Sequence, residues 1–215
     1  MNFYKNKSSK VKIIKTTLLI TILLIAFIIV SAISYVSAVS ENIANSVFRL
    51  HVIANSDSEE DQNLKFIVRD NLIEYMNSLT SGISSKQAAI EIAKEHKQDF
   101  YNIAKKTIED NGYDYDVNIE IGNSYFPTKY YGDISFPAGY YDALKVEIGK
   151  ASGQNWWCVM FPPLCFVDMS TGIVPEESKE TIKDNLPEEE YALISDTHNN
   201  SINFKFKLIE VFYKK

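Results

Sequence analysis

The sequence predicts an α+β domain preceded by one N-terminal hydrophobic helix, and three observations lead to that prediction. Residues 16–40 carry no charged side chain, which is typical of a membrane-spanning or signal helix. Two long segments between residues 59 and 108 repeat apolar side chains every three or four residues, as amphipathic helices do. Several later segments alternate apolar and polar side chains, as strands with one buried face do. We therefore expect an antiparallel sheet with two main helices packed on one face.

The N-terminal segment divides into a basic stretch, residues 1–15, and an apolar stretch, residues 16–38. The basic stretch has five lysines and no acidic residue, so we expect it to stay cytoplasmic while the following chain lies outside. The apolar stretch is long enough to cross a bilayer as a helix. Small residues at Val36-Ser37-Ala38 also suit cleavage after Ala38. A transmembrane anchor and a signal peptide therefore both remain open, followed by an extracytoplasmic α+β domain over residues 41–215.

The composition of the chain excludes some functions. The formal net charge is −6, and removal of residues 1–38 takes away five lysines and no acid, which lowers it to −11. Such an acidic domain is not expected to bind nucleic acid, whose phosphates attract Lys and Arg. The histidines at 51, 96 and 198 are far apart in the sequence, and the cysteines at 158 and 165 do not form a CxxC motif. Neither a zinc site nor another cofactor is predicted.

The first half of the domain is expected to hold one strand and two helices. The strand covers residues 47–54, with Phe48, Leu50 and Val52 on one face. The first helix follows a capping box at Asp57 and Glu60 and ends at Gly82. The second helix follows a capping box at residues 84–87, ends at 111–112, and has an apolar stripe from 89 to 108. His96 lies on that stripe, and we interpret it as a core residue.

The second half is expected to be a meander of antiparallel strands. These strands cover residues 117–121, 125–131, 140–148 and 156–161, with a turn at 137–139, a loop at 149–153 and a stop at 162–163. After residue 169 the chain becomes more acidic. A short helix is expected at 176–185, a further helix start at 188–190 and a final strand at 202–208.

The segment from 155 to 168 has the most unusual residues. Trp156 and Trp157 are adjacent in a predicted strand, so they point to opposite faces. One of them can join the core, and the other must face solvent, a second layer or a partner. The alternative is that both pack beneath the proline loop. Cys158 and Cys165 form either a disulfide around that loop or the nucleophile of a hydrolase, with His51 as its base. The GxSxG, HExxH, P-loop and GxGxxG motifs are absent from the sequence.

Two long motifs resemble the stage II sporulation protein R family. The first motif comprises residues 48–58, Asp61-Gln62, Lys65 and residues 68–70. The second comprises residues 136–140, then Asn155-Trp156-Trp157-Cys158 and residues 161–165. Together they span residues 47–168, in the order of that family and behind a membrane-targeting segment. The sequence departs from the family pattern at Ala151, where the family has a glycine, and this bears on the backbone of the loop.

The resemblance implies an exported signalling protein of endospore formers. Members of this family are made in the forespore and pass into the space between the two septal membranes. There they activate a membrane-embedded aspartic protease, which processes the precursor of the mother-cell sigma factor E. The resemblance therefore implies a messenger rather than an enzyme, with the protease as its partner.

The candidate contact surface combines two groups of residues. The first group is the 155–166 segment, with Trp156 and Trp157. The second group, called the polar corner, lies at and just after the first strand and consists of Arg49, His51, Asn55, Ser56 and Asp57. Two other functions remain open: an exported cysteine-dependent hydrolase, and a purely structural protein of the wall or septum.

Overall fold

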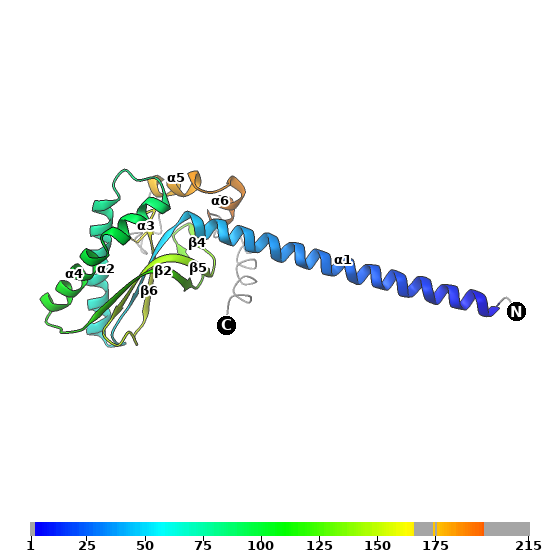
Figure 1. The fold of residues 1–215 in the computed structure, drawn as a ribbon, viewed down its shortest axis with the longest axis horizontal. Coiled ribbons are helices and arrows are strands. Elements are labelled where there is room, and N and C mark those ends of the chain that lie inside the picture. The colour runs from blue at the N-terminus through cyan, green and yellow to red at the C-terminus, as the bar shows by residue number, and fades with distance from the viewer. Residues whose placement is uncertain (1–2, 166–173, 175, 196–215) are drawn as a thin grey trace. The chain divides into compact units, whose positions relative to one another are not determined.

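The computed structural model describes residues 3–165, 174 and 176–195 (Figure 1), in two units, Met1–Val39 and Ser40–Lys215. Helix α1, Phe3–Ser46, contains a segment from Lys12 that is long and apolar enough to cross a membrane. A signal sequence has the same properties, so both forms of membrane targeting fit α1. Its last turns belong to the second unit, where Ile43 is fully buried.

The second unit is built on a four-stranded sheet with the strand order β2-β5-β1-β6. The strands are β1 (Phe48–Ile53), β2 (Val117–Phe126), β5 (Gly139–Ile148) and β6 (Asn155–Phe161). β2 pairs with β5, and β6 with β1, in antiparallel fashion, whereas β1 and β5 are parallel. The expected α+β class is confirmed, and the expected antiparallel sheet is mostly antiparallel, with one parallel pair.

The predicted meander is wrong at one point, because β1 lies between β5 and β6. The segment between them, residues 149–154, therefore crosses the end of β1 instead of making a hairpin. Adjacent strands are about 4.8 Å apart, so a short loop can pass over one strand. Sequence alternation shows which residues share a face, but it does not give the order of the strands.

Helices α2 (Glu59–Leu79), α3 (Lys86–Glu95) and α4 (Lys97–Asp110) cover one face of the sheet (Figure 1). Phe48, Leu50 and Val52 of β1 face these helices and are buried, as the alternation predicts. Their partners from the three helices are Leu64, Val68, Leu72, Ala89, Ile90, Ala93, Phe100, Ala104 and Ile108. The apolar stripes read from the sequence thus form the main core.

The observed helices differ from the predicted ones in two N-cap residues and in one break. The N-cap of α2 is Ser58, whose side chain accepts from the Asp61 amide, and not Asp57. The N-cap of α3 is Ser85 and not Ser84. The single helix expected from 89 to 108 is two helices that meet at His96, so the stripe continues across a break in the backbone hydrogen bonds.

A second layer lies on the other face of the sheet. The hairpin of β3 (Lys129–Tyr131) and β4 (Ile134–Phe136) replaces the single strand expected at 125–131. Helix α6 (Glu188–Ser195) reaches β4, where Ser135 donates to the Ile194 carbonyl at 3.5 Å. Helix α5 (Glu176–Asp184) lies where a helix was expected. The expected strand at 202–208 lies outside the described residues.

Candidate partner-binding site

The two tryptophans of β6 point to opposite faces of the sheet, and both are half-buried. Trp156 lies on the helix side. Its ring meets Phe66 edge to face at a centroid distance of 5.3 Å and lies 4.3 Å from the guanidinium of Arg69. Cation–π contacts of this kind hold an aromatic ring in a fixed orientation. Part of the Trp156 ring therefore stays accessible to solvent in a defined position.

Trp157 lies on the opposite face, where His51 holds it. The two rings stack at a centroid distance of 3.7 Å, and His51 Nε2 is 2.7 Å from Asn155 Oδ1. Burial lowers the pKa of His51 to about 4, although the Asn155 contact opposes the shift. The imidazole is therefore neutral near pH 7, and its Nε2–H donates to Asn155. His51 is buried, so it positions Trp157 and presents little surface of its own.

Arg49 is fully buried beneath the same face. Its Nη2 donates to the Tyr131 hydroxyl at 2.8 Å, and its guanidinium lies 4.1 Å from the Phe126 ring and 4.6 Å from the Tyr141 ring. Among residues 3–165, 174 and 176–195, no carboxylate pairs with it. The Tyr131 hydroxyl donates in turn to the Trp157 carbonyl at 3.1 Å. Arg49 therefore presents no surface of its own; it is joined to the Trp157 backbone through Tyr131, and its Nε donates to the Cys158 carbonyl at 3.5 Å.

Asn55 and Asp57 fasten the loop between β5 and β6. The Lys150 amide donates to Asn55 Oδ1 at 3.0 Å, and the Ser152 hydroxyl donates to the Asn55 carbonyl at 2.7 Å. The Gln154 amide donates to Asp57 Oδ1 at 2.7 Å. These bonds fix the approach to β6, so the polar corner sets where the tryptophan segment begins.

Asp61 completes this corner from inside α2. Its Oδ2 accepts from the Ser56 hydroxyl at 2.5 Å and from the Asn55 amide at 2.7 Å. Burial alone would raise the pKa of Asp61, but the bonds from Ser56, Asn55 and Tyr115 outweigh it and hold the pKa below its usual range. The side chains of Asn55 and Ser56 are thus engaged within the domain.

The loop 149–153 approaches this corner closely. A Cβ added at Gly153 would collide with the Ser56 carbonyl, and one at Gly149 would collide with the Asn55 side chain. Ala151 has a φ of 48°, in the left-handed region that favours glycine. The departure from the family pattern noted in the sequence therefore falls on a residue with glycine-like geometry.

Cys158 and Cys165 are joined by a disulfide with a Cα–Cα distance of 5.2 Å. This closes the turn around Pro162-Pro163, which is the first of the two arrangements considered from the sequence. A disulfide sulfur is not a thiolate, and the thiolate is the nucleophilic form of cysteine. The bonded form therefore does not supply the nucleophile that a cysteine-dependent hydrolase needs.

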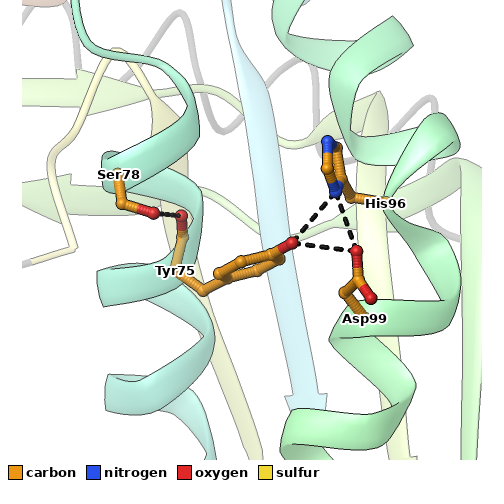
Figure 2. A network of polar contacts seen from close by, with 4 residues as sticks. All are labelled: Tyr75, Ser78, His96 and Asp99. Atoms are coloured by element: carbon orange, nitrogen blue, oxygen red, sulfur yellow. Dashed lines mark hydrogen bonds and ion pairs between the residues drawn. The ribbon is translucent and has the colours of Figure 1, made fainter.

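His96 is not a core residue, which corrects the expectation from the apolar stripe. It sits at the break between α3 and α4 with a half-buried side chain, and Figure 2 shows it facing Tyr75 and Asp99. Its Nδ1 is 2.9 Å from the Tyr75 hydroxyl and 2.8 Å from Asp99 Oδ2. Bonds from His96 and Tyr75 lower the pKa of Asp99. This network joins α2 to the α3–α4 break.

Comparison with known proteins decides the family. The family model described as stage II sporulation protein R matches residues 44–171. The chain belongs to the stage II sporulation protein R family. Stage II sporulation protein R of Bacillus subtilis (strain 168) is 38% identical over 143 residues, or 66% of this chain. The match spans 64% of that relative's length. No solved structure matches the chain.

The matched region contains every candidate residue of the site. Residues 44–171 include β1, the polar corner, the loop and the tryptophans of β6. Helices α5 and α6 and most of α1 lie outside it. The resemblance predicted from the two sequence motifs is thereby confirmed, and the family match covers the sheet that carries the site together with helices α2, α3 and α4.

Sequence reasoning missed three residues that hold the site together. Tyr131 and Phe126 enclose Arg49, and Asp61 anchors the corner. Asp61 appears in the first family motif, and that was a usable signal. Tyr131 and Phe126 are more than 70 residues from Arg49 in the chain, and no local pattern reveals such a contact.

Proposed function

We propose that the domain is an exported intercompartmental sporulation signal, made in the forespore and delivered to the space between the septal membranes. There it activates a membrane-embedded aspartic protease that cleaves the precursor of the mother-cell sigma factor E. It acts by binding and not by catalysis. The observation that carries this proposal is family membership combined with the apolar helix α1 ahead of the domain.

Two features of the chain support export. Five lysines precede the apolar part of α1, and such charge stays on the cytoplasmic side. The Cys158–Cys165 disulfide is of a kind that persists in oxidising compartments outside the cytoplasm. Both features suit a domain that works between two membranes.

Activation by binding requires a difference in affinity. The domain can shift the protease toward its active state only if it binds that state more tightly than the inactive one. Trp156 and Trp157 are the contact residues we propose, because half-buried tryptophans in fixed positions are favoured anchors of interfaces. Arg49 and His51 position Trp157. Asn55, Ser56 and Asp57 hold the loop that leads into β6.

The first test is precursor processing in sporulating cells that lack this protein, followed by immunoblot. The uncleaved precursor is expected to accumulate, and an exported copy of residues 39–215 is expected to restore cleavage. Normal processing without the protein would reject the proposal and favour a structural role in the wall or septum.

The second test concerns the tryptophans. Trp156→Ala and Trp157→Ala are each expected to reduce processing at least tenfold at normal protein amounts. The reason is that truncation of a central interface tryptophan costs roughly 2 kcal/mol or more of binding free energy. Tyr101→Ala is the matched control, since Tyr101 is a half-buried aromatic residue on α4, away from the site. Processing at the wild-type level in both tryptophan variants would remove these residues from the contact surface.

A further inference from the structure

A cleft of about 460 Å³ lies between α2, the β3–β4 hairpin and β6. Three segments line it. Helix α2 contributes Gln62, Lys65 and Phe66, and the other two segments are residues 129–132 and residues 154–158. Leu164 and Cys165 also line it. Both candidate tryptophans line the cleft, so it adjoins the proposed contact surface.

The charge in this cleft is entirely positive. Lys65 and Lys129 line it, and no Asp or Glu is among its described lining residues. Lys65 is 2% exposed, and its Nζ donates only to neutral oxygens, Gln62 Oε1 at 2.5 Å and the Gln154 carbonyl at 3.1 Å. Burial lowers the pKa of both lysines. Within the described part of the chain neither ammonium has a carboxylate partner, although desolvated charges are stable only when compensated.

Five of the other twelve residues that line the cleft are aromatic. Phe66 and Trp156 stand on the α2 side, with Tyr130, Tyr131 and Trp157 also lining the cleft. The indole Nε1 of Trp156 is buried and has no acceptor among the described residues. An ammonium has three donors, and Lys65 uses two. The cleft therefore offers donors beside aromatic rings, one of which, Phe66, lies 4.8 Å from Lys65 Nζ. No acidic residue is among its described lining residues, although Asp57 acts on Lys65 electrostatically.

We propose that this cleft receives an acidic segment of the partner protein, with a Glu or Asp carboxylate placed against Lys65 and Lys129 and apolar side chains against the aromatic wall. This rests on the proposed function, which makes the partner the protease and the segment one of its extracytoplasmic loops. The chain itself has a net charge of −6, so the cleft is an exception to its acidic character. The positive charge of the cleft therefore favours the binding of a negatively charged partner segment.

A peptide fits the cleft better than an anionic membrane does. The acidic domain repels anionic lipid headgroups, and the two lysines lie within a hollow instead of on a protruding basic patch. Rings on several sides suit side chains that enter between them. The membrane is therefore treated as an alternative outcome of the test.

The test removes the two charges while keeping the length of the side chains. Full-length chains with Lys65→Met, Lys129→Met or both are expressed in sporulating cells, and precursor processing is measured by immunoblot. Lys97→Met is the matched control, because Lys97 is an exposed lysine at the start of α4. The double variant is expected to lose at least tenfold in processing, and the control is expected to lose none. If Lys65→Met lowers the amount of folded protein, Lys129→Met alone decides, since Lys129 is only half-buried.

A cross-link identifies the occupant directly. A photoreactive benzoylphenylalanine replaces Tyr130, which lines the cleft and is 51% exposed. Irradiation in sporulating cells is expected to join this position to an Asp- or Glu-containing segment of the protease, identified by mass spectrometry. Lys129→Met is expected to reduce that product. A cross-link to lipid, or a protease cross-link unchanged by both lysine substitutions, would overturn the proposal.

The two proposals fail in different ways. If cells lacking the chain process the precursor normally, the proposed function fails. If those cells do not process it but the folded double-lysine variant does so at the wild-type level, only the cleft proposal fails.

Discussion

The two faces of β1 show two different uses of burial. On the face toward the helices, Phe48, Leu50 and Val52 are buried and apolar. On the other face, Arg49 and His51 are buried as well, although both are polar. The alternation of the sequence suggests a polar, solvent-facing side for Arg49 and His51. Instead, rings from β2, β3, β5 and β6 cover them.

The difference separates residues that stabilise the fold from residues that arrange a surface. Apolar burial contributes about 25 cal/mol per Å², so the helix face supplies folding free energy. Burial of a charge without a carboxylate partner costs free energy. We infer that Arg49 and His51 are kept on their face because they position Tyr131 and Trp157.

The largest effect is expected on the helix face. Leu50→Ala should lower the free energy of unfolding by about 2–5 kcal/mol, because it opens a cavity in a fully buried core. The measurement is urea unfolding of the purified full-length chain in a mild non-ionic detergent.

Arg49→Met provides the comparison from the opposite face. It should change the free energy of unfolding by less than about 1 kcal/mol, because a hydrophobic residue of similar length removes the desolvation cost together with the contacts. The same variant should reduce precursor processing. A loss of stability as large as that of Leu50→Ala would show that both faces serve folding equally.

Asp61 is a buried polar residue that, unlike Arg49, should stabilise the folded domain. Asp61→Asn should cost about 2–3 kcal/mol, because the neutral amide has one acceptor oxygen for the bonds from Ser56, Asn55 and Tyr115 and lacks the charge that strengthens them. Its pKa is lowered in the folded state, so the stabilisation is present above the unfolded pKa and is lost as pH falls through the folded value.

Asp110→Asn is the control for this substitution. Asp110 pairs with Lys106 on the exposed surface of α4, so its removal should cost less than about 0.5 kcal/mol. Urea unfolding at pH 7 compares the two variants. Equal effects would contradict the role assigned to the corner.

These residues also show how far the sequence could be read. The stripe from Leu64 to Leu79 and the alternation in β1 gave the main core, because apolar periodicity is local. The position of β1 between β5 and β6 was missed, because strand order depends on contacts across the whole domain. The environment of Arg49 was missed for the same reason, since its rings come from residues 126 to 141. His96 was misplaced because its stripe runs through a helix break.

His51 gives a smaller effect that depends on pH. Its pKa is about 4 in the folded state against 6.5 when unfolded, so the unfolded state binds more protons between these values. The free energy of unfolding should therefore lose nothing to this titration above pH 6.5, and it should decrease as the pH falls toward 4. After discounting for solvent screening, the loss is on the order of 2 kcal/mol. Lys145 and Glu147 also act on this ring, with opposite signs.

The measurement is urea unfolding from pH 7.5 to 4.5, with His51→Gln as the comparison. The variant should lose most of this slope, while contributions from His96 and the carboxylates remain in both proteins. Identical slopes would show that His51 does not titrate differently on folding.

The smallest effect is expected at Ala151, and it has the opposite sign. A left-handed φ costs an L-residue about 1–2 kcal/mol, and glycine adopts it freely but loses more entropy on folding. Ala151→Gly should therefore stabilise the chain by up to about 1 kcal/mol in urea unfolding. Ala192→Gly, at an exposed position inside α6, should destabilise by a similar amount. The two positions differ in backbone conformation, so destabilisation in both variants would mean that the loop against Asn55 does not hold Ala151 at positive φ.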